Sequence, residues 1–135
     1  SKNLMSFVTA KTKEGIAAGL SEKDAKQLAI RYGSNVDRVF DRVEALKDEA
    51  AKRNIPVHIL AEAEYSIEEE MTATPADFFV RRTGRLFFDI NWVRTYKDAV
   101  IDFMSERFQW DEQAKNKHTE NLNKLLHDAV VPLEQ

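Results

Sequence analysis

The chain has 135 residues, of which 43% are hydrophobic and 32% are charged, values that are ordinary for one soluble globular domain. The net charge of −3 gives no broad attraction to nucleic acid, and the absence of cysteine excludes disulfides, thiolate metal sites and cysteine nucleophiles. No apolar run approaches the roughly 20 residues that a membrane-spanning helix needs. Lys11, Lys13 and Glu14 interrupt the amino-terminal stretch, so the sequence predicts no signal peptide. The chain begins with Ser1 and not with Met, as a fragment or a processed chain would.

The amino-terminal third of the chain predicts two helices. Residues 4–14 predict a weak one. Ser21, with Asp24 three residues later, is typical of a helix start, and Gly33 is typical of the end of the same helix. The apolar positions of this second helix are Ala25, Leu28, Ala29 and Tyr32.

A longer helix is expected next, with Ser34 or Asn35 as its cap and Pro56 after its end, because a proline disfavours the α conformation in the residue before it. Apolar residues recur there every three or four positions, which predicts one buried face. Those residues are Val36, Val39, Phe40, Val43, Leu46 and Ala50, and the residues left to solvent are Lys47, Glu49 and Arg53.

The rest of the chain predicts further helices. One is expected over residues 57–71, and Thr74, followed by Pro75 and Asp77, is typical of the start of a short helix that ends near Gly84. The next two helices are expected to be capped by Asn91 and Asp111. Because no segment alternates as a strand would, the sequence predicts a single all-α domain, a helical bundle of six or seven helices over residues 1–135.

Two charged residues fall on apolar helical faces. In projection, Glu64 lies between Leu60 and Met71, on the side that also carries Ala63 and Ile67, whereas Glu62 and Glu69 point the opposite way. Arg82 lies between Phe78 and Phe79. Since a lone buried charge is costly, we expect Glu64 and Arg82 to form a bidentate ion pair within the domain. The alternative is a helix boundary misplaced by one residue, which would expose both charges.

Arg81 lies four residues after Asp77, the spacing of an ordinary surface ion pair. The alternative is a functional role, in which Arg81 grips an anionic ligand or docks against a partner domain. The basic segment from Arg81 to Lys97 also raises a weaker hypothesis, contact with a phosphate of a substrate or of a lipid headgroup.

No self-contained active site is evident in the sequence. The glycines, at positions 15, 19, 33 and 84, form neither a GxGxxG motif nor a phosphate-binding loop. His58 and Glu62 have a spacing that can ligate a metal, but two ligands do not make a site, and a solvated helix start is the alternative. His118 is expected at the edge of the core and His127 in solvent. We therefore assign no catalytic, cofactor-binding or metal-binding residue.

Four phrases nevertheless resemble a known domain: RYGSN (31–35), AEAEY (61–65), EEM (69–71) and DFFVRRTG (77–84). Over residues 6–131, the chain resembles the C-terminal helical domain of the FAD-dependent aerobic glycerol-3-phosphate dehydrogenases and the related α-glycerophosphate oxidases. The turn from Phe108 to Asp111 departs from that pattern, because Gln109 replaces a family-typical glycine.

The resemblance implies a flavoenzyme that oxidises sn-glycerol 3-phosphate to dihydroxyacetone phosphate and passes electrons to quinone or, in the oxidases, to oxygen. It implies that FAD is bound by a catalytic domain of the same polypeptide and that this segment is non-catalytic, serving docking, stability or partner contacts. Arg81, Arg85 and Arg94 are then the candidates for docking against the catalytic domain. A cytoplasmic enzyme with peripheral contact to the inner face of the cell membrane, and an oligomer, are compatible with the resemblance.

Two alternatives stay open. The first is an oxidase domain, although the lack of an evident insertion favours a dehydrogenase. The second is a stand-alone helical interaction module with no enzyme attached, which an upstream reading frame containing a strand and a GxGxxG motif would exclude.

Overall fold

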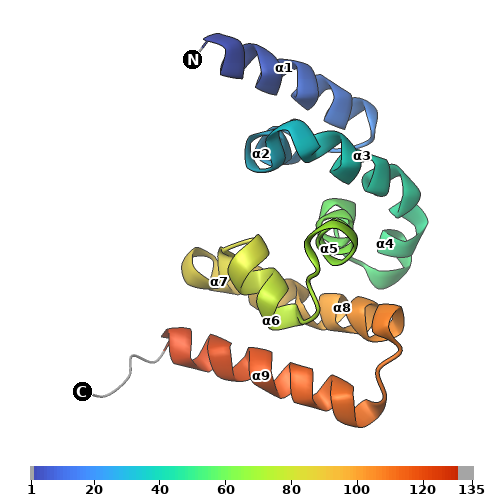
Figure 1. The fold of residues 1–135 in the computed structure, drawn as a ribbon, viewed down its shortest axis with the longest axis vertical. Helices are drawn as coiled ribbons and strands as arrows, with labels where there is room; N and C mark the ends of the chain where they lie inside the picture. The colour runs from blue at the N-terminus through green and yellow to red at the C-terminus, as the bar shows by residue number, and fades with distance from the viewer. Residues whose placement is uncertain (1, 131–135) are drawn as a thin grey trace. The chain divides into compact units, whose positions relative to one another are not determined.

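In the computed structural model, the described part of the chain is residues 2–130, without the side chains of Arg82 and Phe87, and it is helical almost throughout. The longer helices are α1 (Lys2–Ala17), α2 (Glu22–Tyr32), α3 (Val36–Ala45), α4 (Lys47–Arg53), α5 (Val57–Glu70), α8 (Ile90–Phe108) and α9 (Glu112–Val130) (Figure 1). The shorter elements are the 3₁₀ turn η1 (Gly33–Asn35), α6 (Pro75–Asp77), the π-helical turn η2 (Phe78–Arg82) and α7 (Arg85–Phe88). The predicted all-α fold is confirmed. The chain divides into two compact units, Ser1–Tyr65 and Ser66–Gln135.

Three of the predicted helix caps are confirmed. The Ser21 hydroxyl accepts a hydrogen bond from the Asp24 N–H at 3.1 Å, and the Thr74 hydroxyl accepts one from the Asp77 N–H at 3.0 Å. The Asp111 carboxylate accepts one from the Ala114 N–H at 2.8 Å. Each cap satisfies a backbone donor that the first turn of a helix leaves without a partner.

Three local predictions are wrong. Asp89, and not Asn91, caps α8, because its carboxylate accepts the Trp92 N–H at 3.2 Å. Asn35 precedes α3 but makes no capping hydrogen bond with its side chain, since residues 33–35 already form a 3₁₀ turn. The long helix expected up to Pro56 is divided at Leu46, although the bonds from Leu46 N to Arg42 O (3.0 Å) and from Ala50 N to Leu46 O (2.9 Å) carry the backbone through.

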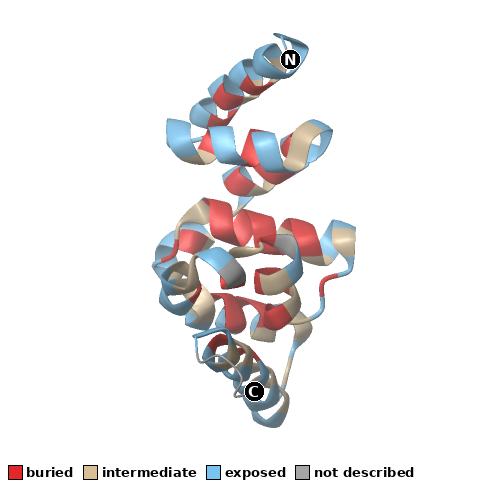
Figure 2. Ribbon diagram, turned by 90° about the vertical axis from the view of Figure 1, so that its left-hand side faces the viewer, coloured by how far each residue is buried: buried red, intermediate tan, exposed pale blue. Residues whose placement is uncertain are grey.

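The first unit packs α1 closely against α2 around a small residue. Gly15 is buried in α1, and a Cβ atom there would lie 2.6 Å from the Ala25 Cβ and 2.9 Å from Cζ of Phe40. Glycine therefore permits the close approach of the helices. The buried faces in Figure 2 include the core of this unit, which contains Ala18, Leu20, Ala25, Leu28, Val36, Val39, Phe40, Val43, Ala61 and Tyr65.

In the second unit, α6, α8 and α9 pack against one another beside a row of aromatic rings. The centroid of Phe79 lies 5.1 Å from that of Phe78 and 5.9 Å from that of Trp92, and Tyr96 follows at 5.6 Å from Trp92. All three pairs are edge-to-face, the arrangement that aromatic quadrupoles favour. The π-helical turn, with Thr83 N bonded to Phe78 O at 3.0 Å, occurs where Phe78 and Phe79 are both fully buried.

The turn between α8 and α9 carries a second aromatic stack. The Trp110 ring lies 4.1 Å from the ring of His118 and 5.6 Å from that of Phe108. His118 is half-buried, as expected at the edge of the core, and His127 is exposed as predicted. Burial, followed by the charge of Lys117, lowers the pKa of His118.

No helix in the described range, residues 2–130, has the length and apolar character required to cross a membrane.

We predict that Gly15→Ala destabilises the protein by about 1–3 kcal/mol, because the added methyl group would overlap Ala25 and Phe40. Chemical denaturation followed by circular dichroism would measure this change. Thr9→Ala, on the exposed side of the same helix, is the control and should alter the free energy of unfolding by less than about 0.5 kcal/mol. A Gly15→Ala protein as stable as this control would contradict the packing argument.

We predict that Gln109→Gly stabilises the protein by about 0.5–1 kcal/mol, because Gln109 holds a left-handed backbone (φ 56°, ψ 45°) that favours glycine. The expected gain is a net value, since glycine also gives the unfolded chain more freedom. Thermal unfolding monitored at 222 nm would detect it. A lower melting temperature would mean that the Gln109 side chain makes a contact worth more than the strain.

Candidate functional site

The predicted Glu64–Arg82 pair stays a prediction. Glu64 is half-buried on α5, but the side chain of Arg82 lies outside the described residues. The backbone of Arg82 ends the π-helical turn η2.

The strongly buried carboxylate on α5 is Glu62, whose side chain is only 2% exposed. The expectation that Glu62 points to solvent is therefore wrong. His58, one turn earlier, is buried too, so the interpretation of this segment as a solvated helix start is also wrong. The error has a physical source: Leu60, Ala61, Ala63 and Tyr65 are all buried, so α5 is covered around most of its circumference and not along one face.

Side chains of α2 and α5 satisfy both oxygens of the Glu62 carboxylate. Arg31 Nη1 donates to Oε1 at 2.8 Å, and the Tyr32 hydroxyl donates to the same oxygen at 3.0 Å. His58 Nδ1 lies 3.1 Å from Oε2, and His58 Nε2 lies 3.7 Å from a carboxylate oxygen of Asp24. We call these five residues the Glu62 cluster. It links two helices that are thirty residues apart in sequence.

Two opposing effects act on the protonation of Glu62. Burial, the larger single effect, raises its pKa, but the hydrogen bond and charge of His58, the charge of Arg31 and the hydrogen bond from Tyr32 together lower it below the ordinary value of 4.5. Glu62 is therefore an ionised carboxylate with its oxygens bonded within the protein. This arrangement suits a structural tie and not a free general base.

The described side chains include no group of three or more His, Asp or Glu residues arranged to hold a metal ion. Asp24 and Glu62 flank His58 and already contact its two ring nitrogens.

Arg81 forms the predicted pair with Asp77, at 3.2 Å between Nε and Oδ1, while its side chain remains 76% exposed. It borders a shallow hollow of about 270 Å³ whose other lining residues are Thr74, Ala76, Asp77, Val80 and Leu125. Thr74 already caps α6, and Asp77 partly neutralises Arg81. This hollow offers one exposed cation and no enclosed anion site.

Arg85 is held inside the second unit. Its guanidinium lies 4.4 Å from the centroid of the Trp92 ring, its Nη1 lies 3.6 Å from the Asp89 carboxylate, and its side chain is only 14% exposed. Arg94, by contrast, is exposed on α8. Of the three docking candidates, Arg81 and Arg94 are thus accessible, whereas the side chain of Arg85 is largely buried.

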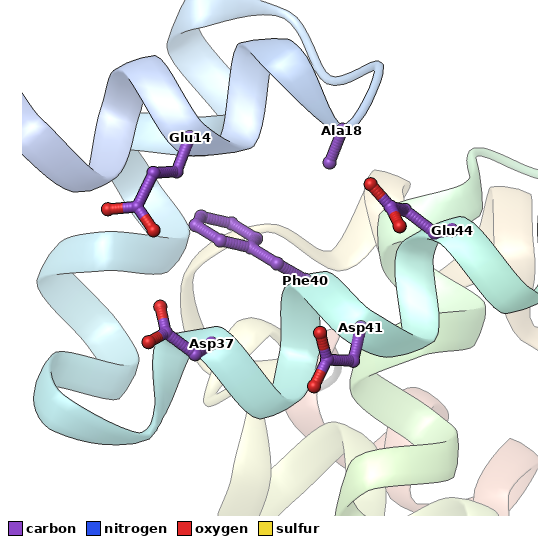
Figure 3. A pocket seen from close by; sticks show the side chains of 6 residues that line it. All are labelled: Glu14, Ala18, Asp37, Phe40, Asp41 and Glu44. Atoms are coloured by element: carbon purple, nitrogen blue, oxygen red, sulfur yellow. The ribbon is translucent and has the colours of Figure 1, made fainter.

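A hollow of about 410 Å³ in the first unit is strongly acidic (Figure 3). The carboxylates of Glu14, Asp37, Asp41 and Glu44 surround the ring of Phe40. Lys11 borders it, with Nζ 2.9 Å from Asp37 and 3.2 Å from Glu14, and these hydrogen bonds raise the pKa of Lys11. An anionic phosphate ester would be repelled here.

We predict that Glu62→Gln costs about 2–4 kcal/mol, because the neutral amide removes the buried charge that Arg31 and Tyr32 bond and faces their donors with a weaker acceptor. The exposed Glu69 of the same helix provides the control, since Glu69→Gln should cost less than about 0.5 kcal/mol. Urea denaturation at neutral pH measures both. Equal effects of the two substitutions would show that the Glu62 cluster contributes no special stability.

The difference in unfolding free energy between the parent protein and Glu62→Gln is expected to depend on pH. Since the folded state lowers the pKa of Glu62 below 4.5, its stabilisation is complete above that pH and is lost as the pH falls through the lowered pKa. The stability difference between the parent and Glu62→Gln should therefore shrink as the pH falls below about 5. A constant difference down to about pH 3 would contradict this sign.

Comparison with known proteins identifies the family to which this chain is similar. Residues 2–115 match the family described as the C-terminal domain of alpha-glycerophosphate oxidase. The aerobic glycerol-3-phosphate dehydrogenase of Staphylococcus haemolyticus is 38% identical over 135 residues, which are 100% of this chain and 24% of that protein. The enzyme of the same name from Staphylococcus aureus is 37% identical over 129 residues, which are 96% of this chain and 23% of that protein.

A solved structure agrees. The glycerol-3-phosphate dehydrogenase from Bacillus halodurans, complexed with FAD, superposes with a TM-score of 0.94 at 40% identity, over 99% of this chain and 27% of that one. This chain thus spans about a quarter of the length of the relatives it matches. On the match of residues 2–115, the chain belongs to the family of the C-terminal domain of alpha-glycerophosphate oxidase.

Proposed function

We propose that this chain is the C-terminal helical domain of an FAD-dependent glycerol-3-phosphate dehydrogenase and that it performs no chemistry itself. The observation that carries the proposal is the match of 100% of this chain to only 24% of a relative of that name. The whole enzyme oxidises sn-glycerol 3-phosphate to dihydroxyacetone phosphate. We favour a dehydrogenase over an oxidase because the relatives quoted above carry the dehydrogenase name.

The residues of this chain do not fit FAD. The sequence has no glycine-rich loop for the pyrophosphate, and the acidic hollow around Phe40 would repel that group. The flavin and the substrate are therefore held by another part of the same polypeptide. This division assigns stability and docking to the helical domain.

Arg81 and Arg94 are the residues through which we propose docking against the FAD-binding part. Both are exposed, and arginine is the basic residue most enriched in the energetically important centres of protein interfaces. Arg85 is not proposed for docking, because its guanidinium lies 4.4 Å from the centroid of the Trp92 ring inside the same unit. The proposed enzyme is cytoplasmic and makes peripheral contact with the inner face of the cell membrane, where its quinone acceptor resides. It also forms oligomers, through surfaces away from the flavin and the substrate.

The test of this function uses the complete polypeptide that contains this chain, beside the 135-residue chain alone. We predict that the complete polypeptide is yellow and reduces a quinone analogue in the presence of sn-glycerol 3-phosphate, whereas the chain alone is colourless and inactive. Oxygen consumption without quinone reduction would instead support the oxidase. Flavin absorbance from the chain alone, or a complete polypeptide without flavin, would overturn the proposal.

The docking role proposed for Arg94 can be tested separately from the enzyme activity. Arg94→Glu should increase the rate at which a protease releases this domain from the complete polypeptide, because it places a like charge opposite the surface that receives Arg94. Lys117→Glu, an equal change of charge at an exposed position of α9, should leave that rate unaltered. Equal effects of both substitutions would argue against specific docking through Arg94.

A further inference from the structure

Met71 combines two unfavourable features directly after α5. Its backbone has a φ of 60°, in the left-handed region that favours glycine, and its side chain is 88% exposed. The position was expected in the core from the helical projection, so its exposure corrects that expectation. The next residue, Thr72, is only 2% exposed, and its N–H is bonded to Ser66 O at 3.0 Å. The turn at Met71 is therefore fixed by a buried neighbour.

The other positions with positive φ carry residues that suit this backbone or solvent. Three are glycines, at 19, 33 and 84, and Asn54 is an asparagine, which tolerates the left-handed conformation. Gln109 is polar and exposed. Among the described residues, Met71 is the only one in which this backbone presents a large apolar side chain to solvent. Strained backbone positions persist where the surrounding structure fixes them, and such positions are concentrated at functional sites.

We propose that Met71 is an anchor that inserts into an apolar socket on the FAD-binding part of the same polypeptide. The inference rests on the proposed function and identifies a contact that the sequence had not assigned to docking. The FAD-binding part is the favoured occupant because the matched relatives are about four times as long as this chain, so a tethered partner is present at high effective concentration. The flexible thioether of methionine adapts to irregular sockets.

The surroundings of Met71 add a requirement for the socket. Glu68 and Glu69 are exposed in the last turn of α5, immediately before Met71. A receiving surface that places Met71 in an apolar socket therefore needs a basic or neutral rim around it, because an acidic rim would meet these carboxylates.

The oxidation rates of the methionines in this chain can test this contact. It has three methionines: Met71, which is 88% exposed, Met5, which is 70% exposed, and Met104, which is fully buried. Dilute hydrogen peroxide converts an accessible thioether to its sulfoxide, and mass spectrometry gives a rate for each residue. In the 135-residue chain alone, Met5 and Met71 should oxidise rapidly and Met104 slowly, which also verifies that the chain is folded.

In the complete polypeptide, we expect the oxidation of Met71 to be about tenfold slower relative to Met5, because insertion removes it from solvent. An unchanged ratio of the two rates would overturn the proposal. Slower oxidation of Met71 in the chain alone as protein concentration rises would also overturn it, because the socket would then belong to a second copy.

A matched pair of substitutions gives an independent measurement. Met71→Gly and Gln109→Gly both relieve a left-handed backbone, so both should raise the melting temperature of the chain alone. In the complete polypeptide, only Met71→Gly should increase the rate of protease release of this domain, by at least about threefold. Equal release from the two variants would contradict an anchoring role. A complete polypeptide that oxidises sn-glycerol 3-phosphate normally while Met71 stays exposed would refute this inference alone, whereas loss of flavin from the unsubstituted protein would refute the proposed function.

Discussion

The first unit depends on the ionised carboxylate of Glu62. A buried carboxylate is costly without partners, and here donors from both α2 and α5 supply them at 2.8–3.1 Å. Apolar contacts between the same helices would tolerate sliding or rotation, whereas Arg31 and Tyr32 must meet one oxygen of Glu62 together. The cluster therefore fixes the register of α2 against α5, and the apolar core of the unit packs around that register.

The elements that the sequence predicted well are those determined within one helical turn. Ser21, Thr74 and Asp111 cap their helices because donor and acceptor are three residues apart. The Glu62 cluster was missed because Arg31 lies thirty-one residues earlier, on another helix. A helical projection of α5 alone cannot show which residues of other helices contact it. One signal was available: the segment HILAEAEY carries apolar residues around its whole circumference, which indicates a helix buried on several sides.

The remaining differences come from backbone geometry that residue types specify weakly. The π-helical turn at Phe78–Arg82 has no sequence signature, and it occurs where two consecutive phenylalanines are both buried. Gln109 is a second case. In the sequence, this glutamine was only a departure from the family pattern in the turn, and the backbone at Gln109 is left-handed, a conformation that favours glycine.

The charges of the chain explain why its function lies in contact and not in catalysis. Glu62, Arg31, Arg85 and Asp89 bind one another or neighbouring rings within their own units, so they are not available to a substrate. The acidic hollow around Phe40 is open but has the wrong sign for a phosphate ester. The second unit exposes Arg81, Arg94 and Met71, the last in a left-handed turn. Arginine and methionine are residue types that are enriched in protein interfaces. The Glu62 carboxylate and the first-turn backbone donors capped by Ser21, Thr74 and Asp111 are bonded within the chain, and the turn at Met71 is held by the buried Thr72, so these surface side chains are what the domain offers to a partner.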